Sequence, residues 1–258
     1  MNRKVTIRDI AYLSGVSIST VSRVVSGKAN VNEETRKAVQ DAIEKTGYEP
    51  NYTARALATK NADTIGVIID RVPSKGLNNT FFIESIQSIA TNLNKYNKDM
   101  LLVFSSTDKS DEDEKVKKLI QSNKVDGIIK LSVQKNDKTL QYLSETETPT
   151  VLVGRSNLKN IISVNNDNVE AMREGVEYLI SKGLIKIAFG ISKKYTEVGK
   201  YIEILTFNNS YLANFSDIPF NSVDINAKEL GRQSVELLLN NNKNIREMLV
   251  ETNLIIRS

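Results

Sequence analysis

The sequence of 258 residues contains no histidine, no cysteine and no tryptophan. Without histidine the chain cannot form a Ser-His-Asp or Cys-His nucleophile pair, and the most common general base is missing. Without cysteine and histidine it cannot form a zinc finger, an iron–sulfur centre or a disulfide framework. These absences disfavour catalysis, and we expect no metal site and no cofactor.

Long apolar runs are also absent. No stretch approaches the roughly 18 apolar residues that a membrane helix requires. The first ten residues carry three cations and one acid with no apolar run behind them, unlike a signal peptide. We therefore expect no membrane partner and a cytoplasmic location, which the lack of cysteine also fits.

The excess of positive charge is confined to the beginning of the chain. The net charge is +4, and residues 1–60 hold ten Lys and Arg against six Asp and Glu, which leaves 25 of each sign in residues 61–258. Such asymmetry predicts a basic, nucleic-acid-binding N-terminal module joined to a neutral body. An excess of four charges can also arise by chance.

Three short helices are predicted between residues 6 and 48. Each is expected to begin at a polar N-cap, and these caps are Thr6, Ser17 and Asn32. Asp9 completes a capping box with the first cap, Gly15 allows a tight turn with positive φ, and Gly47 ends the third helix. Two short helices joined by a glycine turn make a helix-turn-helix, and the alternative is a generic three-helix bundle.

The second of these helices, about 18–25, is expected to expose polar side chains. Val21, Val24 and Val25 form its buried face, and the outward residues are Ile18, Ser19, Ser22 and Arg23. Hydroxyl groups suit contacts to phosphates, and arginine suits a contact to guanine. This face therefore favours DNA binding over a simple bundle.

Five segments of the first 60 residues resemble the DNA-binding head of the LacI family of bacterial repressors: 6–11 (TIRDIA), 15–17 (GVS), 20–24 (TVSRV), 31–36 (VNEETR) and 47–51 (GYEPN). The resemblance implies double-stranded operator DNA as the partner. It implies base-reading positions at Ile18, Ser19 and Arg23. It implies phosphate contacts from Thr6, Ser17, Thr20, Ser22, Asn30, Asn32 and Thr35.

Residues 51–60 follow this head, which occupies residues 1–50. They contain good helix formers but are too few to form a stable isolated helix, so a flexible linker is one reading. The resemblance implies instead a hinge helix that orders when two copies meet in the minor groove. Leu57 then stands where the family places its wedging leucine, which unstacks a base step and bends the duplex.

Residues 61–258 change to alternating strands and helices. Strands are predicted at 64–69, 100–104, 127–131, 150–154 and 185–189, and helices at 82–96, 111–122 and 169–182. This alternation predicts an α/β core with a doubly wound parallel sheet. No glycine-rich phosphate motif follows any strand, so a nucleotide ligand is not expected.

Ligands of doubly wound sheets bind beyond the carboxyl ends of the strands. The polar residues expected there are Asp70, Ser105, Ser132, Arg155 and Asp167. Arg155 and Asp167 are plausible partners for sugar hydroxyls. Asp167 could equally be a helix N-cap, and Arg155 could equally form a surface ion pair.

The core also resembles the LacI family, at residues 79–82 (NTFF), 207–210 (FNNS), 222–224 (SVD), 230–231 (LG) and 237–238 (LL). Its C-terminal sequence is most similar to the maltose-operon repressor branch of that family. The resemblance implies a two-lobed, periplasmic-binding-protein-like core that carries an effector site and the dimer interface, hence a homodimer with a small-molecule sugar effector. Between residues 192 and 204 the chain is shorter than this fold requires. We infer that about 70 residues of the second lobe, a βαβα unit, are missing there.

The leading hypothesis is therefore a dimeric repressor of sugar catabolic genes, of the maltose or maltodextrin type, that responds to an effector by changing the arrangement of its lobes. An alternative is an effector-blind repressor whose ligand lobe is deleted. A third is a sugar-binding protein without a DNA role.

Overall fold

The computed structural model describes residues 5–25, 27, 31–49, 61–70, 73–104, 109–184, 205–209, 220–240 and 244–257. The chain forms two compact units, Met1–Asn61 and Ala62–Ser258, and each is described by itself. Three predicted site residues lie outside the described residues: Asn30, Leu57 and Ser105. The predicted strand 185–189 and the segment 192–204 lie outside them as well.

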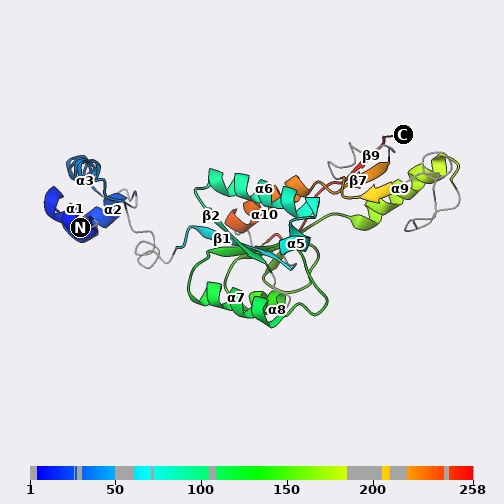
Figure 1. Ribbon diagram of the computed structural model, residues 1–258, viewed down its shortest axis with the longest axis horizontal. Coiled ribbons are helices and arrows are strands. Elements are labelled where there is room, and N and C mark those ends of the chain that lie inside the picture. The colour runs from blue at the N-terminus through cyan, green and yellow to red at the C-terminus, as the bar shows by residue number, and fades with distance from the viewer. Residues whose placement is uncertain are drawn as a thin grey trace. The chain divides into compact units, whose positions relative to one another are not determined.

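The described residues of the first unit form three helices: α1 (Ile7–Ser14), α2 (Ile18–Val25) and α3 (Glu33–Thr46) (Figure 1). Gly15 adopts the predicted left-handed conformation, with φ of 68°, and Gly47 does the same after α3, with φ of 64°. The predicted positions of these helices are confirmed.

Helices of eight residues are too short to be stable alone, so α1 and α2 depend on a shared core. That core buries one apolar stripe from each helix together with a tyrosine after α3: Ile10, Ala11, Val21, Val24, Val39, Ala42 and Tyr48. Val16 packs against the same cluster from the turn between α1 and α2. The burial of Val21 and Val24 fixes which side of α2 faces outward.

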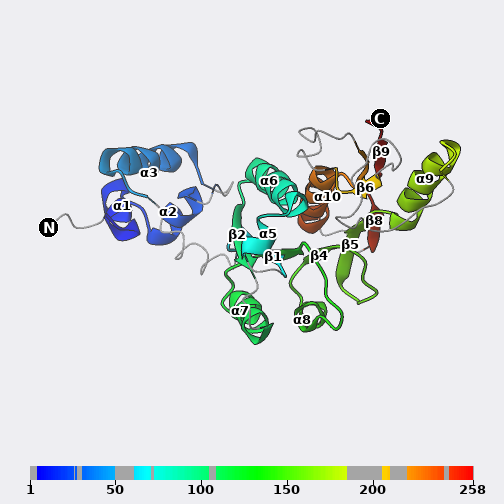
Figure 2. The same cartoon turned by 45° about the vertical axis from the view of Figure 1, so that its right-hand side comes forward.

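The second unit is built on a six-stranded parallel sheet with the order β2-β1-β3-β4-β5-β8. Its strands are β1 (Thr64–Ile69), β2 (Asp99–Phe104), β3 (Gly127–Lys130), β4 (Thr150–Val153), β5 (Ile161–Asn165) and β8 (Glu247–Leu249). Two helices, α6 (Thr80–Lys95) and α10 (Ala227–Asn240), cover one face. Figure 2 shows α7 (Lys109–Gln121) and α8 (Lys138–Glu145) below the opposite face.

Strands β1, β3 and β4 are almost entirely buried, which fits their mostly apolar sequences. Within β1, Ile65, Val67 and Ile69 point into the core under α6 and α10, whereas Ile68 points into the core under α7 and α8. The short helix α5 (Pro73–Gly76) follows β1. A doubly wound parallel sheet is therefore present, as predicted.

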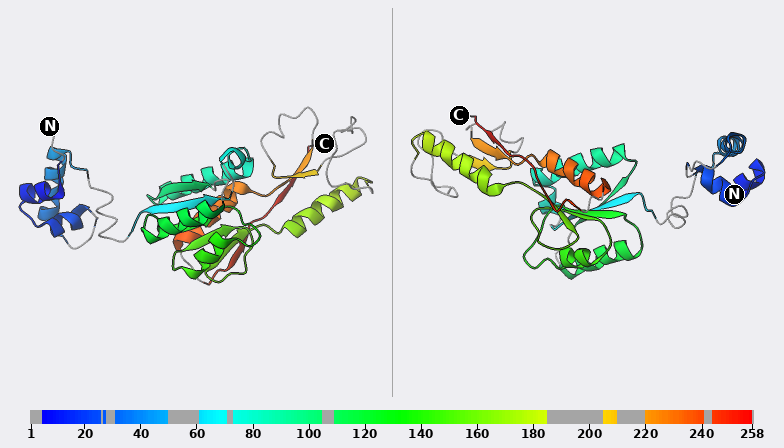
Figure 3. Two further views of the ribbon diagram at one scale, coloured as in Figure 1. Left: turned by 60° about the horizontal axis from the view of Figure 1, so that its bottom comes forward. Right: turned by 180° about the vertical axis from the view of Figure 1, so that it is seen from behind.

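A second, smaller sheet contains β6 (Leu205–Phe207), β7 (Asn221–Asp224) and β9 (Asn253–Ile255). β6 pairs with β7 in parallel, and β7 pairs with β9 antiparallel. Helix α9 (Asn168–Ser181) packs on this sheet (Figure 3). The contact is close, since a Cβ at Gly175 would lie only 2.5 Å from Leu205 Cδ2.

Among the described residues, the chain passes between the two sheets at 165–168, 224–227 and 249–253. These crossings place α10 and β8, which come late in the sequence, on the first sheet. Within the described parts, no helix is both long and apolar enough to cross a membrane.

Candidate DNA-binding and effector sites

The outward face of α2 carries the predicted base-reading residues. Val21 is fully buried, whereas Ile18 is 45% exposed, and Ser19, Ser22 and Arg23 are exposed. The helix therefore presents one apolar, two hydroxyl and one guanidinium side chain along a single surface. Guanidinium and hydroxyl groups are the donors that read guanine and phosphate in DNA.

Three hydroxyl groups meet at the first turn of α2. Ser17 Oγ accepts a hydrogen bond from the Thr20 amide at 3.1 Å, which confirms Ser17 as the N-cap. The same oxygen lies 2.7 Å from Ser19 Oγ and 2.9 Å from Thr20 Oγ1. Hydroxyls and amides gathered at a helix N-terminus form a favourable environment for a phosphate.

The other described phosphate-contact candidates lie at the beginnings of α1 and α3. The Thr6 amide donates to the Asp9 carboxylate at 2.8 Å, and Thr6 Oγ1 donates to the same oxygen at 2.7 Å. Asn32 Oδ1 accepts from the Thr35 amide at 2.8 Å, so Asn32 is the N-cap of α3. The sequence placed these residues correctly at helix starts because Thr, Asp and Asn are cap formers.

At the carboxyl ends of the large sheet, Asp70 and Ser132 lie together. The Asp70 amide donates to Ser132 Oγ at 3.2 Å. The Asp70 carboxylate forms a short hydrogen bond with Lys130 Nζ, and both side chains are buried. This lysine was missed by the sequence analysis, although a cation within the apolar strand GIIK indicates that a buried acid partner is needed.

A second carboxylate completes this buried cluster. Asp137 Oδ2 lies 3.3 Å from Lys130 Nζ, and Asp137 Oδ1 caps α8 by accepting from the Leu140 amide at 2.8 Å. A cavity of about 270 Å³ adjoins the cluster. It is lined by polar residues directly after β1, in α7, and in the segment that leads into α8 and in its first turn: Asp70, Asp113, Gln134, Lys135, Asn136, Asp137, Lys138 and Thr139.

The remaining two described candidates take the structural roles that the sequence left open. Arg155 Nε lies 3.5 Å from Glu247 Oε1 in an exposed ion pair. Asp167 caps α9, since its Oδ1 accepts from the amides of Val169 at 3.2 Å and Glu170 at 3.1 Å. Neither side chain contacts the cluster of Asp70, Lys130 and Asp137 in any described interaction.

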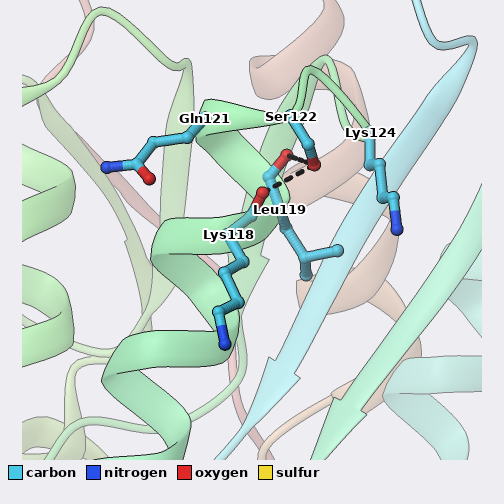
Figure 4. A pocket seen from close by; sticks show the side chains of 5 residues that line it. All are labelled: Lys118, Leu119, Gln121, Ser122 and Lys124. Carbon is cyan, nitrogen blue, oxygen red and sulfur yellow. Dashed lines mark hydrogen bonds between the residues drawn. The ribbon is translucent and has the colours of Figure 1, made fainter.

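A second cavity, of about 370 Å³, lies at the end of α7 and has a simpler structure. Ser122 Oγ donates to the carbonyls of Lys118 at 2.6 Å and Leu119 at 3.3 Å, and so satisfies the helix terminus (Figure 4). The side chains of Lys118 and Lys124 extend away from these bonds (Figure 4). This cavity is therefore lined by the capped end of a helix.

Comparisons with known proteins agree for head and core. Residues 6–51 match the family model described as bacterial regulatory proteins, lacI family. The transcriptional regulator MalR of Streptococcus pneumoniae serotype 4 is 32% identical over 216 residues, which cover 80% of this chain and 66% of that protein. Catabolite control protein A of Streptococcus mutans is 39% identical over 187 residues, covering 72% and 54%. The chain thus spans between about half and two thirds of these relatives.

Among solved structures, a lac repressor dimer bound to operator and an anti-inducer is similar with a TM-score of 0.79. The likeness covers 99% of this chain and 98% of that chain at 18% identity, and it shows the fold. The predicted α/β class with a periplasmic-binding-protein-like core is confirmed by this likeness and by the parallel sheet. Together, these matches and the helix-turn-helix show that the chain belongs to the LacI family of bacterial regulatory proteins.

Proposed function

We propose that this chain is a sequence-specific DNA-binding repressor that reads its operator with α2. The observation that carries the proposal is the outward face of this helix, where Ser19, Ser22 and Arg23 are exposed while Val21 and Val24 are buried. An exposed helix of this kind fits the major groove, with Ile18, Ser19 and Arg23 directed to the bases and Ser22 to a phosphate. A binding role of this kind, in the cytoplasm where the chromosome lies, requires no catalytic group.

The remaining DNA contacts are proposed on the same basis. Phosphate contacts are proposed from hydroxyl and amide side chains at the starts of the three helices: Thr6, Ser17, Thr20, Asn32 and Thr35. Asn30 and Leu57 join them on the resemblance of the sequence alone. The division into a head (1–50), a hinge (51–60) and a core (61–258) belongs to this proposal, as does a homodimer whose two hinges meet over one minor groove.

The effector is proposed to be a sugar of the maltose or maltodextrin type. The name of the Streptococcus pneumoniae relative, MalR, and the polar edge of the large sheet support this proposal. Asp70, Ser105, Ser132, Arg155 and Asp167 stay the candidate ligand residues. Asp70 lines the cavity of about 270 Å³, and its ion pair with Lys130 fixes the position of its carboxylate there. A chain that lacks about 70 residues of a βαβα unit in its second lobe would instead be an effector-blind repressor.

Selection of bound sequences from random DNA tests the main proposal. A repressor dimer should recover a palindrome, with the two half-sites related by the two-fold axis of the protein. Affinity for that palindrome should fall steeply with salt because each phosphate contact releases counterions. Recovery of no common sequence, or a flat salt dependence, would overturn the assignment of the head.

Titration of maltose and maltotriose into the protein–operator complex separates the two forms of the proposal. Release or tightening of the complex by either sugar supports an effector-controlled repressor, since a ligand shifts an equilibrium only through unequal affinity for its states. No change with either sugar, while operator binding persists, favours the effector-blind form.

A further inference from the structure

An ion cluster joins the amino ends of three neighbouring strands. Lys98 lies just before β2, and its Nζ contacts Asp63 Oδ1 at 2.8 Å and Asp126 Oδ2 at 3.0 Å. Asp63 lies just before β1, and Asp126 lies just before β3. The three side chains are 18–21% exposed, so one ammonium group holds two carboxylates at the rim of the sheet.

The same cluster holds the backbone that leads into β1. The Ala62 amide donates to Asp126 Oδ1 at 2.6 Å. Asp63, whose φ is 50°, accepts through its carbonyl from the Asp99 amide at 2.7 Å, and the Thr64 carbonyl accepts from the Asp126 amide at 2.8 Å. Residues 62–64 are therefore hydrogen-bonded to Asp99 before β2 and to Asp126 before β3, at the point where β1 begins.

The electrostatics favour a persistent cluster. Burial lowers the pKa of Lys98, but the hydrogen bonds and charges of Asp63 and Asp126 raise it more, and the resulting pKa lies above the ordinary value. The ammonium is thus charged at neutral pH and available to both carboxylates. Partly buried pairs of this kind are less screened by salt than pairs on an open surface.

The sheet also has its own strand pairing and its own buried cores. β1 pairs with β2 from Thr64 to Ile69 and with β3 from Ile65 to Ile68, and its buried side chains contribute to both cores. The cluster binds residues 62–64, which lie at the start of β1 and close after segment 51–60 in the sequence. Its place suggests a role in the attachment of that segment.

We propose that Lys98, Asp63 and Asp126 anchor the start of the core, and that they act as positioning residues for specific operator binding. This inference rests on the proposed function. A fixed attachment point limits the conformations open to the preceding segment, and so raises the effective concentration of the correctly placed head. Non-specific binding, which needs no exact placement, should depend on it little.

The test compares full-length variants on two duplexes, the operator recovered by selection and a scrambled duplex of equal length. Lys98→Met should weaken operator binding about tenfold, within the range of coupling through networks, and change scrambled-duplex binding less than about twofold. Lys98→Arg keeps the positive charge and should retain most of the operator affinity. Arg173→Met, which removes a cation paired with Glu170 and Glu177 on α9, is the matched control and should change neither affinity.

Hydrogen exchange gives a second, DNA-independent measurement. In Lys98→Met, and in Asp126→Ala, the amides of residues 62–64 should exchange faster while those of Val67 and Ile68 stay protected. Equal losses on the two duplexes, or unchanged exchange at Ala62, would overturn the anchor. If the unaltered chain fails to discriminate between duplexes, the proposed function has failed, and the exchange measurement alone then decides for or against the anchor.

Discussion

The side-chain amide of Asn166 donates a hydrogen bond to the Val250 carbonyl at 2.8 Å. The same nitrogen donates to the Ile225 carbonyl at 3.1 Å, and Asn166 is 4% exposed. These three residues belong to the three segments that pass between the large and the small sheet. One buried amide group therefore ties all three crossings together.

Replacement of Asn166 by leucine should destabilise the core strongly. Leucine has a side chain of the same branched shape but donates no hydrogen bond, so the carbonyls of buried Val250 and partly buried Ile225 lose a donor. An unsatisfied buried polar group costs about 1–3 kcal/mol, and we expect a loss of about 2–4 kcal/mol in the free energy of unfolding, measured with urea. Asn168→Leu, at an exposed position on α9, is the control and should stay within about 0.5 kcal/mol of the unaltered chain.

The buried pair of Lys130 and Asp70 predicts a second stability effect. Lys130→Met leaves the Asp70 carboxylate buried without its cation, and removal of one member of a buried pair costs about 3–5 kcal/mol. The double variant Lys130→Met/Asp70→Asn removes the charges of Lys130 and Asp70 and should recover part of this loss, since the carboxylate of Asp137 remains. Urea unfolding of the single and double variants measures the coupling. A single-variant loss below about 1 kcal/mol would contradict the pairing.

The sequence predicted local structure well wherever one short-range signal was sufficient. The buried β-branched run at 64–69 became β1 with the same limits, and the caps Thr6, Ser17 and Asn32 began three helices as expected. Strand β5 and helix α8 are two of the elements that were not predicted. Each is short, and the run through β5 contains Ser163 and Asn165 among its apolar residues.

Long-range polar pairs were beyond the reach of the sequence. Lys98 contacts acids that lie 35 and 28 residues away, and Asn166 contacts carbonyls 59 and 84 residues away. No periodicity encodes such pairings, because they depend on which strands become neighbours in the sheet. Asp167 and Arg155 show a second limit of the sequence. An aspartate that caps a helix or an arginine in a surface ion pair is the same residue type that a ligand site would use, so the sequence left both roles open.

The ion pair of Glu229 in α10 predicts a contribution to the free energy of unfolding that is lost at acid pH. Hydrogen bonds from Arg232, with Nε to Oε2 at 2.7 Å, lower the pKa of Glu229 below its ordinary value of 4.5, against the opposing effect of burial. A lowered folded-state pKa means that the stabilisation is complete above pH 4.5 and is lost as pH falls through the folded value.

Glu229→Gln should therefore cost about 0.5–1 kcal/mol at pH 7, the scale of a partly exposed pair, and progressively less below pH 4.5. Urea unfolding across this pH range measures the difference. Arg232→Met should remove the same pH-dependent stabilisation, because it removes the guanidinium that lowers the pKa of Glu229. A difference that grows towards acid pH would contradict the assigned sign.

Arg23 predicts the largest specificity effect within α2. Its guanidinium is exposed in the last turn of the helix, where a bidentate contact to guanine is proposed. Arg23→Ala should weaken binding to the selected operator by about 1–3 kcal/mol and relax the preference at one base pair per half-site. Lys45→Ala, which removes an exposed cation from α3, is the control. Equal effects of the two substitutions would point to charge alone.

Leu57 predicts a different pattern, one that separates specific from non-specific DNA binding. A leucine wedge gains contact only when the duplex is bent and a base step is opened, which happens at the operator. Leu57→Ala should therefore weaken operator binding by about 2 kcal/mol, the scale of burying a leucine side chain, or roughly 30-fold. Binding to a scrambled duplex should change little. Anisotropy titrations at fixed salt measure both, and equal losses would show that Leu57 belongs to an ordinary linker.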